Sequence, residues 1–319
     1  VLMLVATVRA YGSDSLSGAS QVTLLVVSAF CVLIGMCFLK VPWKKFEEAI
    51  VFNITNVATA VIILLLIGAL SGAWMVSGVV PSLIYYGVQI IHPDVFLVSS
   101  CIISAMVSVM TGSSWTTIAT IGIALMGIGR AQGFDDGWIA GAIISGAYFG
   151  DKISPLSDTT VLASGSVNVP LFQHIRYMVI TTLPSIVIAS VVFFVVGLMF
   201  EGSDTGEIAA FSQALSGRFN ITPWLLAVPV LTGIMIAKRW PPIITLFLST
   251  LLAVVFALVF QSDVLGEIAD GDLFKGAMQS VYGSTSIPTD SQLLTDLVAT
   301  RGMAGMMGTI WLILCAMCF

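Results

Sequence analysis

The sequence contains very little charge. Only 9% of its 319 residues are Asp, Glu, Lys or Arg, whereas soluble domains usually carry about 25%. Apolar residues make up 58% and the mean hydropathy is +1.05, which excludes a water-soluble domain and indicates a membrane protein. The net charge is -5, and the sequence has no basic block and no glycine-rich phosphate loop. Nucleic-acid and nucleotide binding therefore have no support.

Residues that commonly bind metals are also scarce. The two histidines, His92 and His174, are too few and too far apart in sequence to form a metal site. We interpret the cysteines as small hydrophobic residues rather than disulfide partners or metal ligands, because all of them lie in apolar runs. They are Cys31, Cys37, Cys101, Cys315 and Cys318. The sequence predicts no resident metal and no cofactor.

Long runs without charge divide the chain into candidate membrane spans. About 20 helical residues cross a hydrocarbon layer of about 30 Å, and most of the runs fit one span, whereas 57–91 can hold a span plus an interfacial helix. The runs are 21–39, 57–91, 95–129, 137–150, 177–200, 219–237, 240–260 and 302–319. The predicted fold class is therefore an all-α, polytopic helical bundle.

Run 95–129 is too long for one helix and too short for two. Its centre, TGSSWTT at Thr111–Thr117, is rich in hydroxyls and contains a glycine, which predicts a re-entrant hairpin that enters and leaves the bilayer on one side. With this hairpin, the main basic clusters fall on the cytoplasmic side, as expected for an inner-membrane protein. These clusters are Lys40, Lys44 and Lys45, then His174 and Arg176, then Lys238 and Arg239.

A weak internal repeat suggests how the single transmembrane domain, 1–319, is organised. FEEA at Phe46–Ala49 precedes an apolar stretch, as FKGA at Phe274–Ala277 does. The first copy begins inside and the second outside, which is typical of inverted-topology transporters. The predicted segments are a first repeat at 40–200 with hairpin 95–129 and broken helix 137–164, connecting spans at 201–260, and the start of an incomplete second repeat at 272–319.

The chemistry lies in GAYFGDKISPLSDTT, Gly146–Thr160. Run 137–150 is too short to cross the bilayer, so its span must continue through Asp151, Lys152 and Asp158. A charge at mid-membrane costs about 2.5 to 3.5 kcal/mol and requires a partner, a wet cavity or a function. Pro155 removes an amide donor and disfavours helix at the residue before it, which predicts a helix break with free carbonyls. Upstream, Ala142, Gly146 and Gly150 recur every four residues and favour close helix packing.

Carboxylate, hydroxyl and carbonyl oxygens are the ligands of hard cations, and we extend this to Na⁺. The candidate ion-binding and proton-coupling residues are Asp151, Lys152, Ser154, Ser157, Asp158, Thr159 and Thr160, with Na⁺ at Asp151 and Asp158 and the helix break at Gly150 and Pro155. The candidate hairpin residues are Thr111, Gly112, Ser113, Ser114, Thr116 and Thr117.

Simpler interpretations of these residues stay open. Asp158 fits the cap of a resumed helix, and Asp151 fits an ion pair with a basic residue elsewhere. The hairpin hydroxyls can bond back to helix carbonyls. Lys152 either occupies the site when the cation is absent or extends toward the membrane surface.

Four segments together resemble the NhaC-type Na⁺/H⁺ antiporter family over most of residues 40–200. They are TGSSWTT (111–117), IGIALMGIG (121–129), AGAIISGAYFGDKISPLSDTT (140–160) and LFQHIRYM (171–178). The resemblance implies inverted repeats, each with a hairpin and a broken helix, in a chain longer than this one, so this chain is expected to be truncated at both ends. One departure is VLAS at Val161–Ser164, where an Asn-Leu-Ala-Pro-like stretch is expected, which leaves the ligand set near Thr160 open.

The resemblance implies a secondary antiporter, not an enzyme, that exchanges cytoplasmic Na⁺ for external H⁺ in a prokaryotic inner membrane. The expected partners are Na⁺, H⁺ and the lipid bilayer, and a homodimer is allowed. The main alternative is cation-coupled exchange of organic acids such as malate and lactate. A passive channel is another alternative, and it differs from an exchanger because its ion flux cannot run against a gradient. An intramembrane aspartyl protease is a remote alternative, because Tyr148 replaces the first glycine of a Gly-x-Gly-Asp motif.

Overall fold

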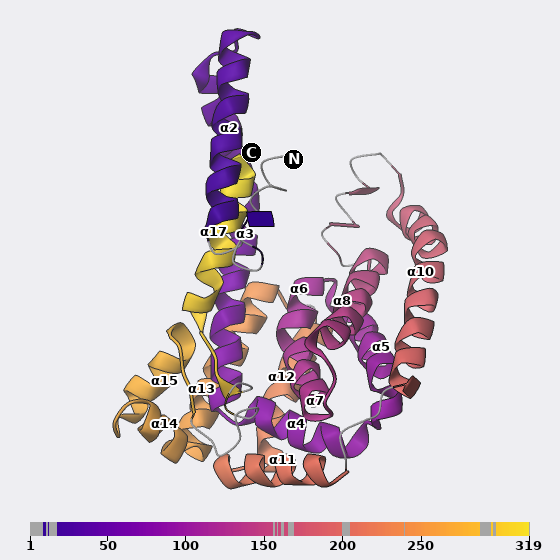
Figure 1. The fold of residues 1–319 in the computed structure, drawn as a ribbon, viewed down its shortest axis with the longest axis vertical. Coiled ribbons are helices and arrows are strands. Elements are labelled where there is room, and N and C mark those ends of the chain that lie inside the picture. Colours follow the sequence, from indigo (N-terminus) through magenta and orange to yellow (C-terminus); the bar gives the residue numbers. More distant parts are fainter. Residues whose placement is uncertain are drawn as a thin grey trace. The chain divides into compact units, whose positions relative to one another are not determined.

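The computed structural model is built from helices, with one isolated antiparallel bridge between Thr285 and Thr300 among the described residues (Figure 1). It describes residues 9–10, 12, 18–155, 157, 159–160, 163–164, 169–199, 205–238, 240–287, 295 and 298–318. The chain forms two compact units, residues 1–68 with 303–319 and residues 69–302.

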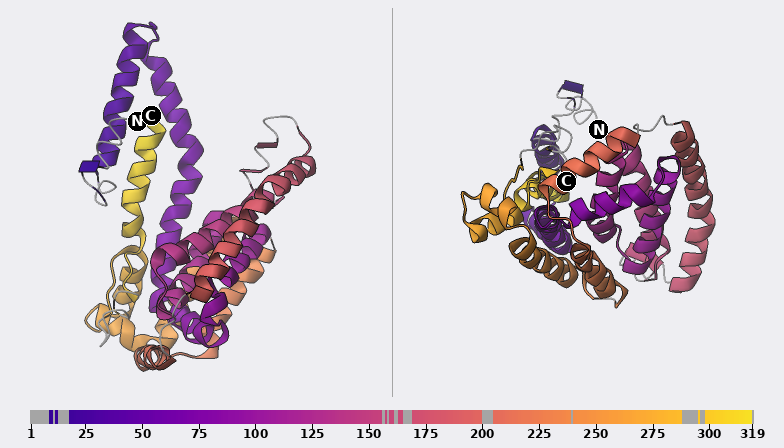
Figure 2. Two further views of the ribbon diagram at one scale, coloured as in Figure 1. Left: turned by 45° about the vertical axis from the view of Figure 1, so that its right-hand side comes forward. Right: turned by 90° about the horizontal axis from the view of Figure 1, so that it is seen from below.

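The first unit contains α2 (Ala19–Cys37), the first part of α3 (Trp43–Val76) and α17 (Met307–Cys318). The short 3-10 helix η4 (Met303–Met306) comes directly before α17. Figures 1 and 2 show these helices side by side. The ring of Trp311 on α17 lies against Gly18 at the start of α2. Asn53 Nδ2 on α3 donates to the carbonyl of Met317, 3.3 Å away.

The centre of the second unit is the pair α5 (Pro93–Thr111) and α8 (Asp136–Ile153), which run parallel. A Cβ added at Gly146 would lie 2.0 Å from the carbonyl oxygen of Cys101, and one at Gly150 would lie 2.4 Å from that of Ala105. These glycines therefore let the two backbones touch, as their four-residue spacing predicts.

The chain reverses direction between α5 and the helices that follow it. Gly112 adopts a left-handed conformation, φ 66°, and its N–H donates to the carbonyl of Ser108. The return arm consists of α6 (Ser114–Thr117), the π-helix η2 (Ile118–Gly122) and α7 (Ile123–Ala131). Gly122 packs near Ile143 and Gly129 near Ile139, so this arm runs antiparallel to α8. How deeply this hairpin enters the bilayer stays a prediction.

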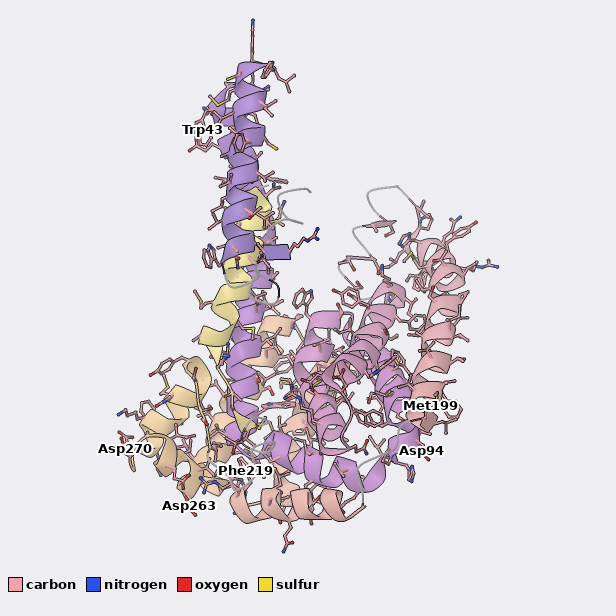
Figure 3. All side chains as sticks on the ribbon, viewed as in Figure 1. Trp43, Asp94, Met199, Phe219, Asp263 and Asp270 are labelled. Carbon is pink, nitrogen blue, oxygen red and sulfur yellow. The ribbon has the colours of Figure 1, made fainter. Side chains whose placement is uncertain are left out.

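α8 begins after a surface turn closed by the ion pair of Arg130 with Asp136, 2.6 Å, and it ends at Ile153. Ser154 is extended, with ψ 129°, at the residue before the proline, as proline sterics require. α10 (Leu171–Met199) runs antiparallel to α5, because Gly197 near its end packs on the carbonyl of Asp94 at the start of α5. Figure 3 labels Asp94 and Met199 at these neighbouring ends.

The remaining helices of this unit are α4 (Val79–Ile90), α11 (Thr205–Arg218), η3 (Pro223–Leu226), α12 (Ala227–Ala237), α13 (Pro242–Phe260), α14 (Ser262–Ile268) and α15 (Leu273–Tyr282). The buried Gln261, which follows α13, links the end of this helix to the segment after α11. Its side-chain amide both donates to and accepts from the backbone of Asn220, at 3.1 Å each.

In the described part of the chain, four helices are long and apolar enough to cross a membrane: α2, α3, α10 and α13. The bent pair Ser212–Arg218 and Pro223–Ile236 adds a fifth if it counts as one span. The expectation of an all-α, polytopic membrane protein is confirmed. The inverted repeat and its boundaries stay predictions.

Candidate functional site

The helix break after α8 lies beside the end of α5, because these two helices run parallel and in close contact. Ser154 Oγ, at the break, donates to the carbonyl of Val109 over 2.8 Å. One turn earlier, Ser108 Oγ donates to the carbonyl of Ala147 over 2.5 Å. Both serines are fully buried. The hairpin tip and the broken helix therefore meet at one level of the bundle.

A direct contact joins the return arm of the hairpin to the acidic residue of α8. Ser114 Oγ donates to Asp151 Oδ2 over 2.9 Å. Ser114 is the first residue of α6, which continues without interruption into η2 and α7. Negative charge is stabilised near the N-terminus of a helix, so the start of this arm suits a carboxylate. Ser113, the N-cap, accepts from the N–H of Thr116 over 3.2 Å.

Further oxygens gather where the chain continues after Pro155. Thr160 Oγ1 lies 3.3 Å from the carbonyl of Asp151 and 3.2 Å from that of Lys152, and donates to them. Ser157 Oγ lies 2.8 Å from Thr159 Oγ1. Ser157 and Thr160 are buried, and Asp151 is half-buried. Carboxylate, hydroxyl and carbonyl oxygens thus surround the end of α8, and this donor set suits a hard cation.

Several sequence candidates lie elsewhere or bond differently. Lys152 is exposed, and the ion pairs of the described residues include neither Lys152 nor Asp151. Thr117 donates to the carbonyl of Ser113 over 3.0 Å, which is the back-bonding alternative, whereas Thr116 donates to the side-chain oxygen Ser113 Oγ over 3.1 Å. Asp158 lies outside the described residues, as does the side chain of Thr111.

Sequence reasoning missed two features of this region. Ser100, Ser104 and Ser108 recur every four residues on α5 and are fully buried, and this spacing was the available signal. The second feature is the π-helix η2, for which no sequence signal is evident. Such segments occur frequently at functional sites.

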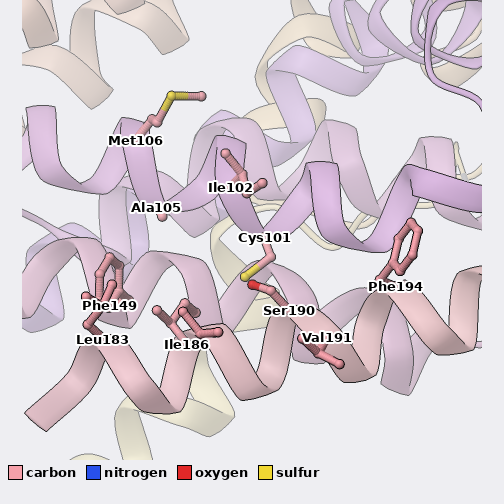
Figure 4. A pocket seen from close by; sticks show the side chains of 11 residues that line it. Cys101, Ile102, Ala105, Met106, Phe149, Leu183, Ile186, Ser190, Val191 and Phe194 are labelled. Carbon is pink, nitrogen blue, oxygen red and sulfur yellow. The ribbon is translucent and has the colours of Figure 1, made fainter.

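An apolar pocket of about 440 Å³ lies between α5, α8 and α10, next to this polar region. Phe149 of α8 lines it, and Figure 4 shows Cys101 of α5 and Ser190 of α10 pointing toward each other at its centre. No charged residue lines this pocket, so it does not suit an ion. In the described residues, no three His, Cys, Asp or Glu side chains gather as a metal site would require.

Curated relatives align with most of the chain. The malate-2H⁺/Na⁺-lactate antiporter of Bacillus subtilis is 39% identical over 91% of this chain and 60% of the relative. The Na⁺/H⁺ antiporter NhaC of Alkalihalophilus pseudofirmus is 38% identical over 90% and 61%. The arginine/ornithine antiporter ArcD of Halobacterium salinarum is 34% identical over 96% and 62%.

This chain spans about three fifths of the length of these relatives. No solved structure shows a significant match. Residues 146–319, more than half of the chain and including the end of α8, match the profile of the Na⁺/H⁺ antiporter family. The chain therefore belongs to the Na⁺/H⁺ antiporter family.

Proposed function

We propose that this chain carries the ion site of a secondary antiporter that exchanges Na⁺ for H⁺ across a prokaryotic inner membrane. The observation that carries the proposal is the hydrogen bond from Ser114 to Asp151, 2.9 Å, at the meeting point of hairpin and helix break. A carboxylate at this position can hold either a proton or a cation. Membership of an antiporter family supports the same function.

Exchange then follows from competition for Asp151. A proton on the carboxyl displaces Na⁺, and Na⁺ displaces the proton, so that one site carries each in turn. Hydroxyls such as Ser114 and Thr160 can turn their oxygens toward the cation, and the carbonyls at the end of α8 add ligands. We include Asp158 as the second carboxylate, seven residues further along the chain. Alternating access requires one bundle of helices to move against another.

The test uses the full chain in proteoliposomes that contain a pH-sensitive dye. An imposed Na⁺ gradient should drive protons in the opposite direction, and should do so against an existing proton gradient. A choline gradient of the same size is the control and should move no protons. Proton flux that only runs downhill would contradict the proposal and indicate a passive channel.

Exchange of organic ions is the second candidate function, because two of the relatives are a malate/lactate and an arginine/ornithine antiporter. The N-terminus of the hairpin's return arm also suits a substrate carboxylate. Counterflow of labelled malate or lactate from preloaded proteoliposomes distinguishes this function. Rapid counterflow, together with no proton movement under a Na⁺ gradient alone, would favour it.

Replacing Ser114 by alanine is expected to weaken Na⁺ binding. The Ser114 hydroxyl is one of the proposed ligands of the cation, and polar contacts to charged groups contribute about 1.5 to 3 kcal/mol. Without this ligand, the Na⁺ concentration for half-maximal exchange should rise about tenfold or more. Ser185→Ala is the matched control, because its hydroxyl bonds only to the carbonyl of Thr181 in its own helix. An unchanged Na⁺ dependence in Ser114→Ala would show that this hydroxyl does not act on the site.

A further inference from the structure

An open groove of about 430 Å³ lies between α12, which ends at Ala237, and α13, which starts at Pro242. This volume falls within the range of about 300 to 1,000 Å³ that is typical of ligand pockets. Aliphatic side chains form its walls, including Ile234 of α12 and Leu248, Leu251 and Val255 of α13. Leu251 and Val255 are 46% and 53% exposed, so the groove is open to its surroundings.

The two helices hold each other through a different face. Thr232 Oγ1 lies 2.7 Å from Ser249 Oγ, which accepts a hydrogen bond from Trp74 Nε1 over 3.0 Å. Thr232 and Ser249 are buried. This polar contact fixes the helix pair from inside the unit, so the apolar groove on its outer side is preformed.

One end of the groove carries a cation and a tryptophan. Lys238 and Trp240, which lie between the two helices in sequence, line this end, and both are exposed. The sequence has no Asp or Glu between Arg218 and Asp263, and Lys238 belongs to no ion pair in the described residues. Within the described part of the chain, the mouth of this apolar groove thus presents a positive charge that is paired with no carboxylate.

We propose that this groove binds an anionic glycerophospholipid. One acyl chain lies along the aliphatic walls, the phosphate lies beside Lys238, and the indole of Trp240 lies at the level of the headgroups. Lipid phosphates are attracted by basic residues at membrane surfaces, and tryptophan is enriched at this depth.

The dimensions fit one leaflet. Val255 is 13 residues from Pro242, or about 20 Å at 1.5 Å per residue, which exceeds half of a 30 Å hydrocarbon core. An acyl chain that starts at Trp240 can therefore stay in contact with α13 across its leaflet. This site is separate from Asp151 and does not depend on which ions the protein exchanges.

The experiment uses the full chain in vesicles that contain phosphatidylglycerol with a photoreactive group in one acyl chain. Crosslinks should map to 231–235 and 248–255. Phosphatidylcholine with the same reactive chain should give fewer of them. Lys238→Gln should reduce the phosphatidylglycerol yield at low lipid fraction about fivefold, the factor expected from about 1 kcal/mol per basic residue. Leu251→Trp should fill the groove and abolish the crosslinks.

Two variants are matched controls. Lys275→Gln removes an exposed lysine from α15, and Val259→Trp adds a tryptophan at a position of α13 that is 67% exposed and outside the groove. Both should crosslink like the unmodified chain. Equal yields for the two lipids, persistence of the crosslinks in Leu251→Trp, or full competition by inorganic phosphate would each overturn the proposal. An absence of crosslinks in the groove would show that protein covers it and would overturn the proposal as well.

Discussion

Replacing Asp151 by asparagine is expected to abolish Na⁺-driven proton movement. Asparagine neither exchanges a proton nor neutralises a cation, although it can still accept the hydrogen bond of Ser114. Two unit charges 4 Å apart attract by about 4 kcal/mol at an effective dielectric constant of about 20. Loss of the charge should therefore lower Na⁺ affinity at least about 100-fold, which is measured as dye response against Na⁺ concentration in proteoliposomes.

Asp136→Asn, the same substitution at the first residue of α8, is the matched control. Asp136 forms a surface ion pair with Arg130, and such pairs contribute only about 0 to 1 kcal/mol. Asp136→Asn should therefore exchange ions within about twofold of the unmodified chain. Asp151→Glu should retain part of the activity, with a shifted pH profile, because it keeps a titratable carboxyl. Full pH-dependent exchange by Asp151→Asn would remove this residue from the mechanism.

Asp158→Asn tests the second proposed carboxylate separately. If both aspartates hold the cation, this variant should also lose exchange. If Asp158 only caps a resumed helix, the variant should lose stability and keep its Na⁺ dependence. Melting and transport measured on the same preparation distinguish these outcomes.

Replacing Gly146 by alanine is expected to cause the largest loss of stability. The new Cβ would lie 2.0 Å from the carbonyl oxygen of Cys101, a backbone atom that cannot rotate away. Overpacking typically costs about 1 to 3 kcal/mol, and more where nothing yields. α5 and α8 must then separate, which also disturbs Ser108 and Ser154 at the helix break. The melting temperature in detergent and the rate of ion exchange in proteoliposomes should both fall.

Gly233→Ala is the matched control, since Gly233 also lies inside a helix but has no atom within 4 Å of an added Cβ. There, alanine should leave stability unchanged or raise it by up to about 1 kcal/mol, because glycine disfavours helix. Equal melting temperatures for the two variants would show that the contact between α5 and α8 is not as tight as the structure has it.

The sequence predicts local backbone features of the site better than it predicts which side chains contact each other. Pro155 forces the residue before it out of the helix, an effect that depends on a neighbouring residue alone. The four-residue spacing of Gly146 and Gly150 indicates that another helix packs closely there, but not which helix. The sequence does not predict which hairpin hydroxyl contacts Asp151. Ser114 reaches Asp151 while Thr116 and Thr117 bond to Ser113, and nothing in TGSSWTT distinguishes these side chains in advance.

The choice among the hairpin hydroxyls depends on how α8 is aligned lengthwise against α5, which is set by backbone contacts between residues 45 positions apart in sequence, Gly146 with Cys101 and Gly150 with Ala105. The spacing of the serines on α5 indicates that Ser108 is buried, but its hydrogen-bond partner, the carbonyl of Ala147, could not be predicted for the same reason. Composition alone does not reveal the π-helix η2 either.

The contact of α5 with α8 also constrains how the protein can move. Where two backbones touch at Gly146 and Gly150, no intervening side chains are available to change rotamer and let one helix slide along the other. We therefore expect the hairpin tip and the helix break to move together as one rigid body. Hinges and sliding surfaces should then lie where flexible side chains separate the helices, and a crosslink between α5 and α8 should leave the proposed ion exchange intact.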